Sequence, residues 1–201
     1  MLWPTPGHGQ TNWPPVIDMH VHSTNTSPEA VMERMTNRNV RFVFLSALSP
    51  DLPKWRSAID SQRLLPSIGF PCPGGRAVIT GRSCFGEAVD LPDLGWLRRE
   101  IQAGRIKALG EVVQQYLGMS PNDPRMEPYW RLAEECDIPV AIHMGPGPPG
   151  IAYDSTAVPV RAPQYRMSMG DPVLLEEVLL RHKRGCNRNC VNRAEQITKH
   201  R

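Results

Sequence analysis

Two histidines separated by one residue, His20 and His22, are the part of this sequence best suited to chemistry. They end the short apolar run 16–22, which is typical of a β-strand. Side chains alternate along a strand, so both imidazoles point to one face, with about 6–7 Å between their Cα atoms. Neutral imidazole nitrogens at that spacing can bind one divalent ion. The alternative interpretation is a pair of surface histidines on an edge strand.

Two further candidates, Glu111 and His143, follow later strand-like runs. Glu111 lies near the end of the run 106–112, and His143 near the end of the apolar run 138–144. Alone, His143 could be a structural histidine, and Glu111 the ion-pair partner of a neighbouring Lys or Arg such as Lys107. Together with the His-x-His pair, however, they all fall at the carboxyl ends of predicted strands, which meet at one edge of a parallel sheet. We therefore expect a metal site at that edge.

The elements that must position these residues alternate between strands and helices, which predicts a parallel α/β sheet. We predict five strands, at 16–22, 40–46, 65–70, 106–112 and 138–144. As short apolar runs, they are expected to be covered on both faces. Helices are predicted to begin at Ser27-Pro28, Pro92-Asp93 and Asp171-Pro172, and Gly104 to end the second of them. Asp123-Pro124 is expected to begin the approach to a further helix that ends near Cys136, and Pro128 leaves its start open by a turn.

Periodicity does not distinguish an open sheet from a closed barrel. Two long loops rich in Gly and Pro, 71–92 and 145–172, interrupt the pattern. The second follows the fifth predicted strand and is placed to contribute to a site at the carboxyl edge.

Composition sets only broad limits on function. The chain has 201 residues and a formal net charge of +3, with its basic excess concentrated in residues 181–201, so nothing indicates a nucleic-acid partner. No run of apolar residues is long enough to span a membrane, and residues 1–15 contain no apolar signal segment. Five irregularly spaced cysteines favour reduced thiols and a cytoplasmic location.

Four segments together resemble the amidohydrolase superfamily, in its amidohydrolase-related (amidohydrolase-2) branch of metal-dependent hydrolases. They are IDMHVH at 17–22, IKALGEV at 106–112, DIPVAIHMGPGPPG at 137–150 and DPVLLEEVLLRH at 171–182. The resemblance implies a (β/α)8 TIM-type barrel of which this chain holds about the first five βα units. It implies that His20 and His22 are metal ligands, and that His143 is a further ligand or positions water. Glu111 stands where the family varies.

The chain departs from that family after residue 182. The family places another His on strand six and an Asp on strand eight, and neither has a counterpart here. Residues 183–201 are basic and poor in large apolar side chains. We therefore divide the chain into a lead (1–15), a partial barrel domain (16–182) and a basic tail expected to be disordered (183–201). A truncated barrel predicts open sheet edges and weak or absent turnover.

By resemblance, the expected activity is hydrolysis of small carbonyl compounds, such as cyclic amides, lactones or esters, by metal-activated water. One divalent ion is expected, with Zn²⁺ as the first choice and Mn²⁺ or Fe²⁺ open. Glu111 and His143 are the candidate catalytic residues. Two alternatives remain: a metal-dependent nonoxidative decarboxylase of an aromatic or enoic acid, and a remnant without catalysis. The substrate and the oligomeric state are not predicted.

Overall fold

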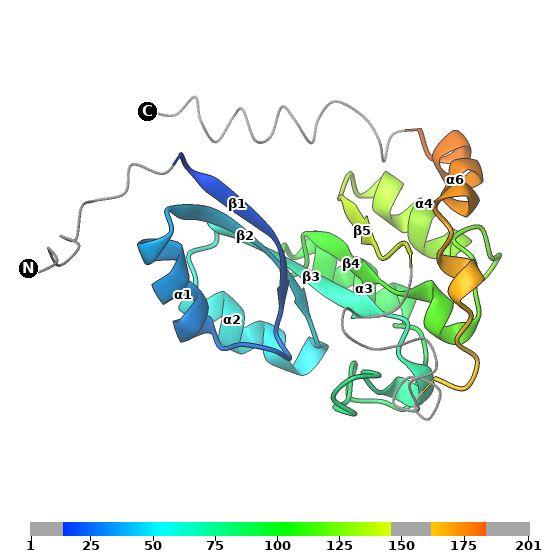
Figure 1. Ribbon diagram of the computed structural model, residues 1–201, viewed down its shortest axis with the longest axis horizontal. Coiled ribbons are helices and arrows are strands. Elements are labelled where there is room, and N and C mark those ends of the chain that lie inside the picture. The colour runs from blue at the N-terminus through cyan, green and yellow to red at the C-terminus, as the bar shows by residue number, and fades with distance from the viewer. Residues whose placement is uncertain (1–13, 146–161, 184–201) are drawn as a thin grey trace, which may run out of the picture.

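A computed structural model describes residues 14–145 and 162–183 of the chain. The chain has an α/β fold with one five-stranded, all-parallel sheet in the order β1-β2-β3-β4-β5. The strands are β1 (Val16–His22), β2 (Val40–Ala47), β3 (Leu64–Phe70), β4 (Ala108–Val112) and β5 (Val140–Ile142). The sheet curls, so that the strands follow one another around an arc (Figure 1). The predicted parallel α/β sheet is confirmed, and closure into an eight-stranded barrel stays a prediction.

Helices connect the strands and pack along the sheet, with α1 and α2 beside β2 and β3 (Figure 1). The α-helices are α1 (Pro28–Asn37), α2 (Leu52–Ala58), α3 (Leu94–Gln102), α4 (Glu127–Glu135) and α6 (Glu176–Arg181). The 3-10 helices are η1 (Ser49–Asp51), η2 (Pro73–Gly75), η3 (Gln114–Leu117), η4 (Met167–Gly170) and η5 (Pro172–Leu175). None of the helices in the described ranges is both long enough and apolar enough to cross a membrane.

Local capping explains where the predicted helices begin. The Ser27 hydroxyl accepts a hydrogen bond from the Ala30 amide at 3.2 Å, and the Asp93 carboxylate accepts one from the Trp96 amide at 2.6 Å. Both satisfy amides that the first turn of a helix leaves unpaired. The helix predicted at Asp171-Pro172 begins instead as the 3-10 turn η5 and continues as α6. The short helix α2 was not predicted.

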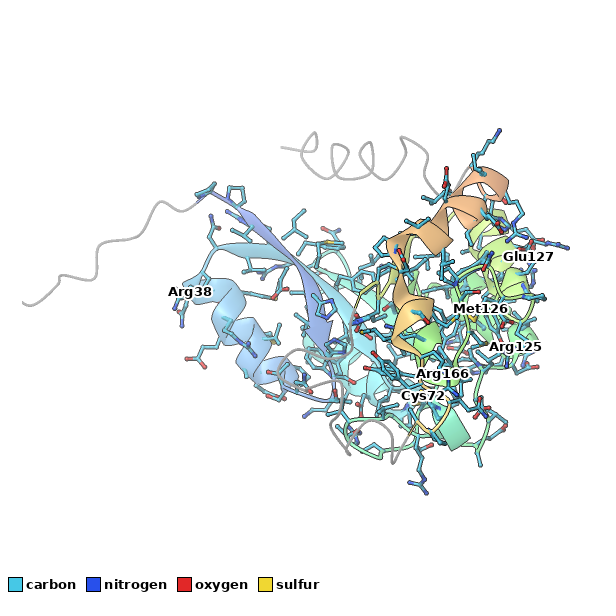
Figure 2. All side chains as sticks on the ribbon, turned by 45° about the vertical axis from the view of Figure 1, so that its right-hand side comes forward. Arg38, Cys72, Arg125, Met126, Glu127 and Arg166 are labelled. Atoms are coloured by element: carbon cyan, nitrogen blue, oxygen red, sulfur yellow. A yellow bond between two sulfur atoms is a disulfide. The ribbon has the colours of Figure 1, made fainter. Side chains whose placement is uncertain are left out.

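The main core lies between the sheet and the helices. Its centre consists of fully buried side chains from β2, β3, β4 and α3, including Leu45, Ile68, Leu97 and Leu109. Met126, which precedes α4 and is labelled in Figure 2, is buried against the same cluster. This closely packed core holds the strands in a fixed register. The site residues lie at the carboxyl ends of those strands.

The expectation that all strands are covered on both faces is wrong for β1. Val16, Ile17 and Met19 have exposed fractions of 42%, 49% and 56%. Because β1 is an edge strand, β2 is its only neighbour among the strands that the structure describes. The predicted strand 138–144 shortens to the three residues of β5, the other edge.

The prediction of reduced thiols is wrong for two of the five cysteines. Cys72 and Cys84 form a disulfide within the loop that follows β3, and Cys72 is labelled in Figure 2. Both side chains are buried beside Leu48. Their pairing depends on the path of the loop, because spacing along the sequence does not bring two cysteines together. The disulfide also removes the argument from reduced thiols for a cytoplasmic location, since such bonds are rare in reducing compartments, and the location stays a prediction.

The structure describes little of the two terminal segments that the sequence predicts. Most of the lead (1–15) and of the basic tail (183–201), and the larger part of the glycine- and proline-rich loop 145–172, lie outside the described residues.

Candidate metal centre

His20 and His22 lie on the same face at the carboxyl end of β1, as the alternation of a strand predicts. Their Nε2 atoms are 2.9 Å apart, and the two rings meet edge to face. The Asp18 carboxylate accepts a hydrogen bond from the His20 amide at 3.1 Å, which steadies the strand just before the pair. The His20 side chain is 61% exposed and that of His22 28% exposed, so both remain accessible to a ligand.

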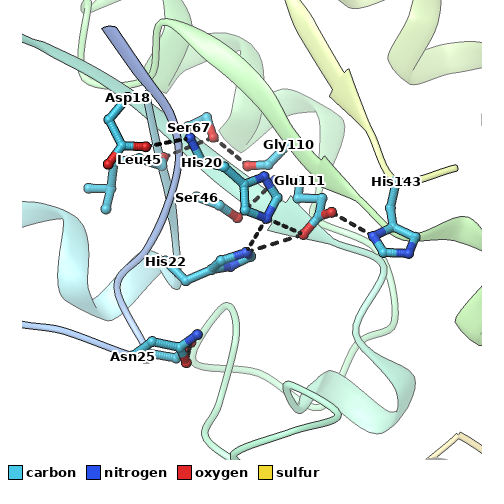
Figure 3. A network of polar contacts seen from close by, with 11 residues as sticks. Asp18, His20, His22, Asn25, Leu45, Ser46, Ser67, Gly110, Glu111 and His143 are labelled. Carbon is cyan, nitrogen blue, oxygen red and sulfur yellow. Dashed lines mark hydrogen bonds and ion pairs between the residues drawn. The ribbon is translucent and has the colours of Figure 1, made fainter. Parts of the chain in front are cut away.

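Glu111 brings a carboxylate from β4 to this pair. Its Oε2 atom lies 3.3 Å from Nε2 of His22 and 3.7 Å from Nε2 of His20 (Figure 3). The alternative of an ion pair between Glu111 and Lys107 is not what the structure shows, because the Lys107 ammonium donates to the Ser61 carbonyl oxygen. Two separate segments of sequence, β1 and β4, therefore supply one cluster, although they are not adjacent strands.

A serine from β2 fixes the backbone of Glu111. The Ser46 hydroxyl accepts a hydrogen bond from the Glu111 amide at 2.8 Å, reaching across β3. Gly69 makes this contact possible, since a Cβ there would lie 3.1 Å from the Ser46 hydroxyl oxygen. Gly110 is required for a related reason: its φ is +134°, and a Cβ would come within 2.6 Å of the Ala141 carbonyl oxygen.

Ser46 and Gly69 were both missed from the sequence. The signals were present, namely a lone hydroxyl at the end of an apolar strand and a glycine inside another strand. Neither signal says which amide the hydroxyl accepts from.

The Glu111 carboxyl is held in its ionised form. Burial, the largest single influence, raises its pKa. Hydrogen bonds from His143 and His22, together with the charges of His143 and His20, outweigh burial and lower the pKa from 4.5 to about 2. A carboxylate that stays ionised at neutral pH is suited to bind a cation, and it is a weak base toward a proton.

His143 lies on the other side of the same carboxylate, just after β5. Its backbone amide donates to the Val112 carbonyl oxygen at 2.8 Å, and its Nδ1 lies 2.7 Å from Oε1 of Glu111 (Figure 3). The side chain is only 16% exposed. The predicted ligands were His20, His22 and His143. Among the described residues, the group whose donor atoms all lie within 4.8 Å of one another consists instead of His20, His22 and Glu111. The role of His143 as a direct ligand stays a prediction, and its observed contact is with Glu111.

The three donors fit a tetrahedral divalent ion. With metal–ligand bonds of about 2.0–2.2 Å, neighbouring donors in a tetrahedron lie about 3.3–3.6 Å apart. The observed separations among His20 Nε2, His22 Nε2 and Glu111 Oε2 are 2.9, 3.3 and 3.7 Å, on both sides of that value. Two imidazoles and a carboxylate also form a donor set found in catalytic zinc sites, which keep the fourth position for water or substrate.

The fold and this cluster define a class: a parallel α/β chain with a candidate metal centre at the carboxyl ends of its strands. No family model matches the chain, and no curated protein or solved structure is significantly similar to it. The geometry of the cluster is therefore what points to a function.

Proposed function

We propose that this chain is a metal-dependent hydrolase of the amidohydrolase type, acting on small carbonyl compounds such as cyclic amides, lactones or esters. The observation that carries the proposal is the convergence of His20, His22 and Glu111 within 4.8 Å. Loops at the carboxyl ends of parallel strands build the active sites of α/β folds, and this cluster lies there. The curled parallel sheet supports the further proposal that the fold is the first part of a (β/α)8 barrel.

The residues divide the chemical work between them. A divalent ion, with Zn²⁺ as the first choice and Mn²⁺ or Fe²⁺ as the others, would supply a Lewis acid that polarises a carbonyl and acidifies water. His20, His22 and Glu111 would hold it, with Glu111 contributing the negative charge. Because His143 donates from Nδ1 to Glu111, the neutral ring has Nε2 as its proton-accepting atom. His143 is thus the better candidate to move a proton, and Glu111 the better ligand.

A second candidate function is metal binding without turnover. It is supported by the 61% exposure of His20 and by the position of β1 at an edge of the sheet. Electrostatic stabilisation of a transition state is strongest where water is excluded, and an exposed ligand works against that. Metal binding would then persist while hydrolysis is weak.

Metal content tests the proposal directly. The gel-filtered chain is analysed by plasma mass spectrometry beside a His20→Ala/His22→Ala double variant. The matched control is His182→Ala, which removes an imidazole whose ring contacts Glu127 and Glu134. We expect about one divalent ion per chain in the wild type and the control, and none in the double variant. Absence of metal from the wild type would refute the proposal.

Activity assays then separate the chemistries. Lactones, cyclic amides and esters are screened for hydrolysis, and aromatic acids for release of CO2, with the double variant as the blank. Hydrolysis that the double variant lacks supports the first candidate. Metal binding with no turnover of any substrate class supports the second.

A further inference from the structure

A chain of polar contacts begins one residue after the second histidine of the metal centre. Ser23 follows His22 directly and is only 7% exposed. Its backbone amide donates to the Ser46 carbonyl oxygen at 3.0 Å, and its hydroxyl accepts from the Leu48 amide at 3.2 Å. The same hydroxyl donates to the Asp51 carboxylate at 2.7 Å. The end of an edge strand is thus tied to the segment that follows β2.

Asp51 in turn binds a residue from a third segment. The Arg82 guanidinium donates two hydrogen bonds to the Asp51 carboxylate, at 3.0 and 2.5 Å. Such a two-point pair fixes orientation as well as distance. The Asp51 side chain is 17% exposed, whereas Arg82 is 48% exposed.

Arg82 is itself held in place by the disulfide loop. Its carbonyl oxygen accepts from the Ala77 amide at 2.9 Å, and Cys84, two residues later, is bonded to Cys72. The Cys84 carbonyl oxygen also accepts from the Ser49 amide at 2.8 Å. The segments after β1, β2 and β3 therefore meet at Asp51.

We infer that Asp51 and Arg82 are positioning residues of the metal centre, which hold His22 in place through Ser23. The inference rests on the proposed metal centre. β1 has a neighbouring strand on one side only among the described residues, and its pairing with β2 is irregular between Asp18 and Val21. After that irregularity the ladder holds only Val21 and His22, opposite Leu45 and Ser46, before β1 ends. Groups that hydrogen-bond directly to a metal ligand change metal affinity about 10- to 100-fold when they are removed. Asp51 and Arg82 act on His22 through Ser23, so we expect an effect at the lower end of that range.

The test measures cobalt binding, because Co²⁺ reports both affinity and coordination geometry through its visible absorption. Wild type, Asp51→Asn, Arg82→Gln and Arg82→Lys are titrated with Co²⁺ after chelator treatment, and the thermal unfolding of each metal-free protein is recorded. Arg98→Gln is the matched control. Arg98 pairs with Glu135 at 2.6 Å, and its side chain is 45% exposed, a fraction similar to the 48% of Arg82. That pair joins α3 to α4, outside the three segments that meet at Asp51.

We expect Asp51→Asn and Arg82→Gln to raise the Kd for Co²⁺ about tenfold and to change the absorption spectrum. Arg82→Lys keeps the charge and should recover part of the affinity, and Arg98→Gln should bind as the wild type does. An unchanged Kd and spectrum in Asp51→Asn and Arg82→Gln would overturn the inference, even if those variants unfold at lower temperature. A wild type that binds no Co²⁺ would refute the metal centre itself, which is a distinguishable outcome.

Discussion

Replacing Glu111 by Gln should lower the stability of the metal-free protein by an amount that depends on pH. The substitution keeps the shape of the side chain and removes the charge that His143 and His22 stabilise. A pKa lowered from 4.5 to about 2 corresponds to about 3 kcal/mol of folding free energy at pH 7. The folded pKa lies below the unfolded value, so this stabilisation is complete above about pH 5 and is lost as the pH falls through 2.

The assay is urea unfolding of the wild type and of Glu111→Gln with chelator present, at pH 7 and at pH 3. The difference in unfolding free energy should be about 3 kcal/mol at pH 7 and less than half of that at pH 3. The matched control is Glu135→Gln, which removes a carboxylate from an exposed ion pair with Arg98 and should cost less than about 1 kcal/mol at both pH values. A difference that is the same at both pH values would refute the reasoning, because the stabilisation would then not come from the ionised carboxyl.

Two further predictions concern the scaffold. The double variant Cys72→Ala/Cys84→Ala should lose about 3 kcal/mol in the free energy of unfolding, since the bond joins cysteines 12 residues apart and restricts the unfolded chain. It should also bind Co²⁺ more weakly because the bridged loop carries Arg82. Unchanged urea midpoints would contradict the first part, and an unchanged Kd the second. Ile68→Ala should cost about 2–5 kcal/mol because the side chain is fully buried, while Ile17→Ala, 49% exposed, should cost about 0.5 kcal/mol or less. Equal losses in urea unfolding would show that β1 is covered in solution.

Strand positions could be predicted because the signal for them is local. The predicted run 16–22 is β1 itself, and the others differ from the observed strands mainly at their ends. Helix starts at Ser27 and Asp93 were equally local, since each side chain caps an amide only three residues away. The helix α2 was missed because it is only seven residues long, too short for a clear apolar period.

The distribution of burial could not be predicted in the same way. An apolar run does not reveal whether a strand will be central or at an edge of the sheet. The exposed Ile17 and the buried Ile68 lie in similar runs, and only the strand order separates them. The disulfide could not be predicted either, because it depends on how the loop 71–92 folds back on itself.

The sequence by itself determined that His20 and His22 share a face, since a period of two is a property of any strand. It also placed Glu111 and His143 at the ends of later strands. Only the tertiary structure decided how these groups combine: Glu111 faces the histidine pair, and His143 contacts the far oxygen of its carboxylate. The physical reason is that β1, β4 and β5 come together through the register and curl of the sheet, which depend on packing across the whole core.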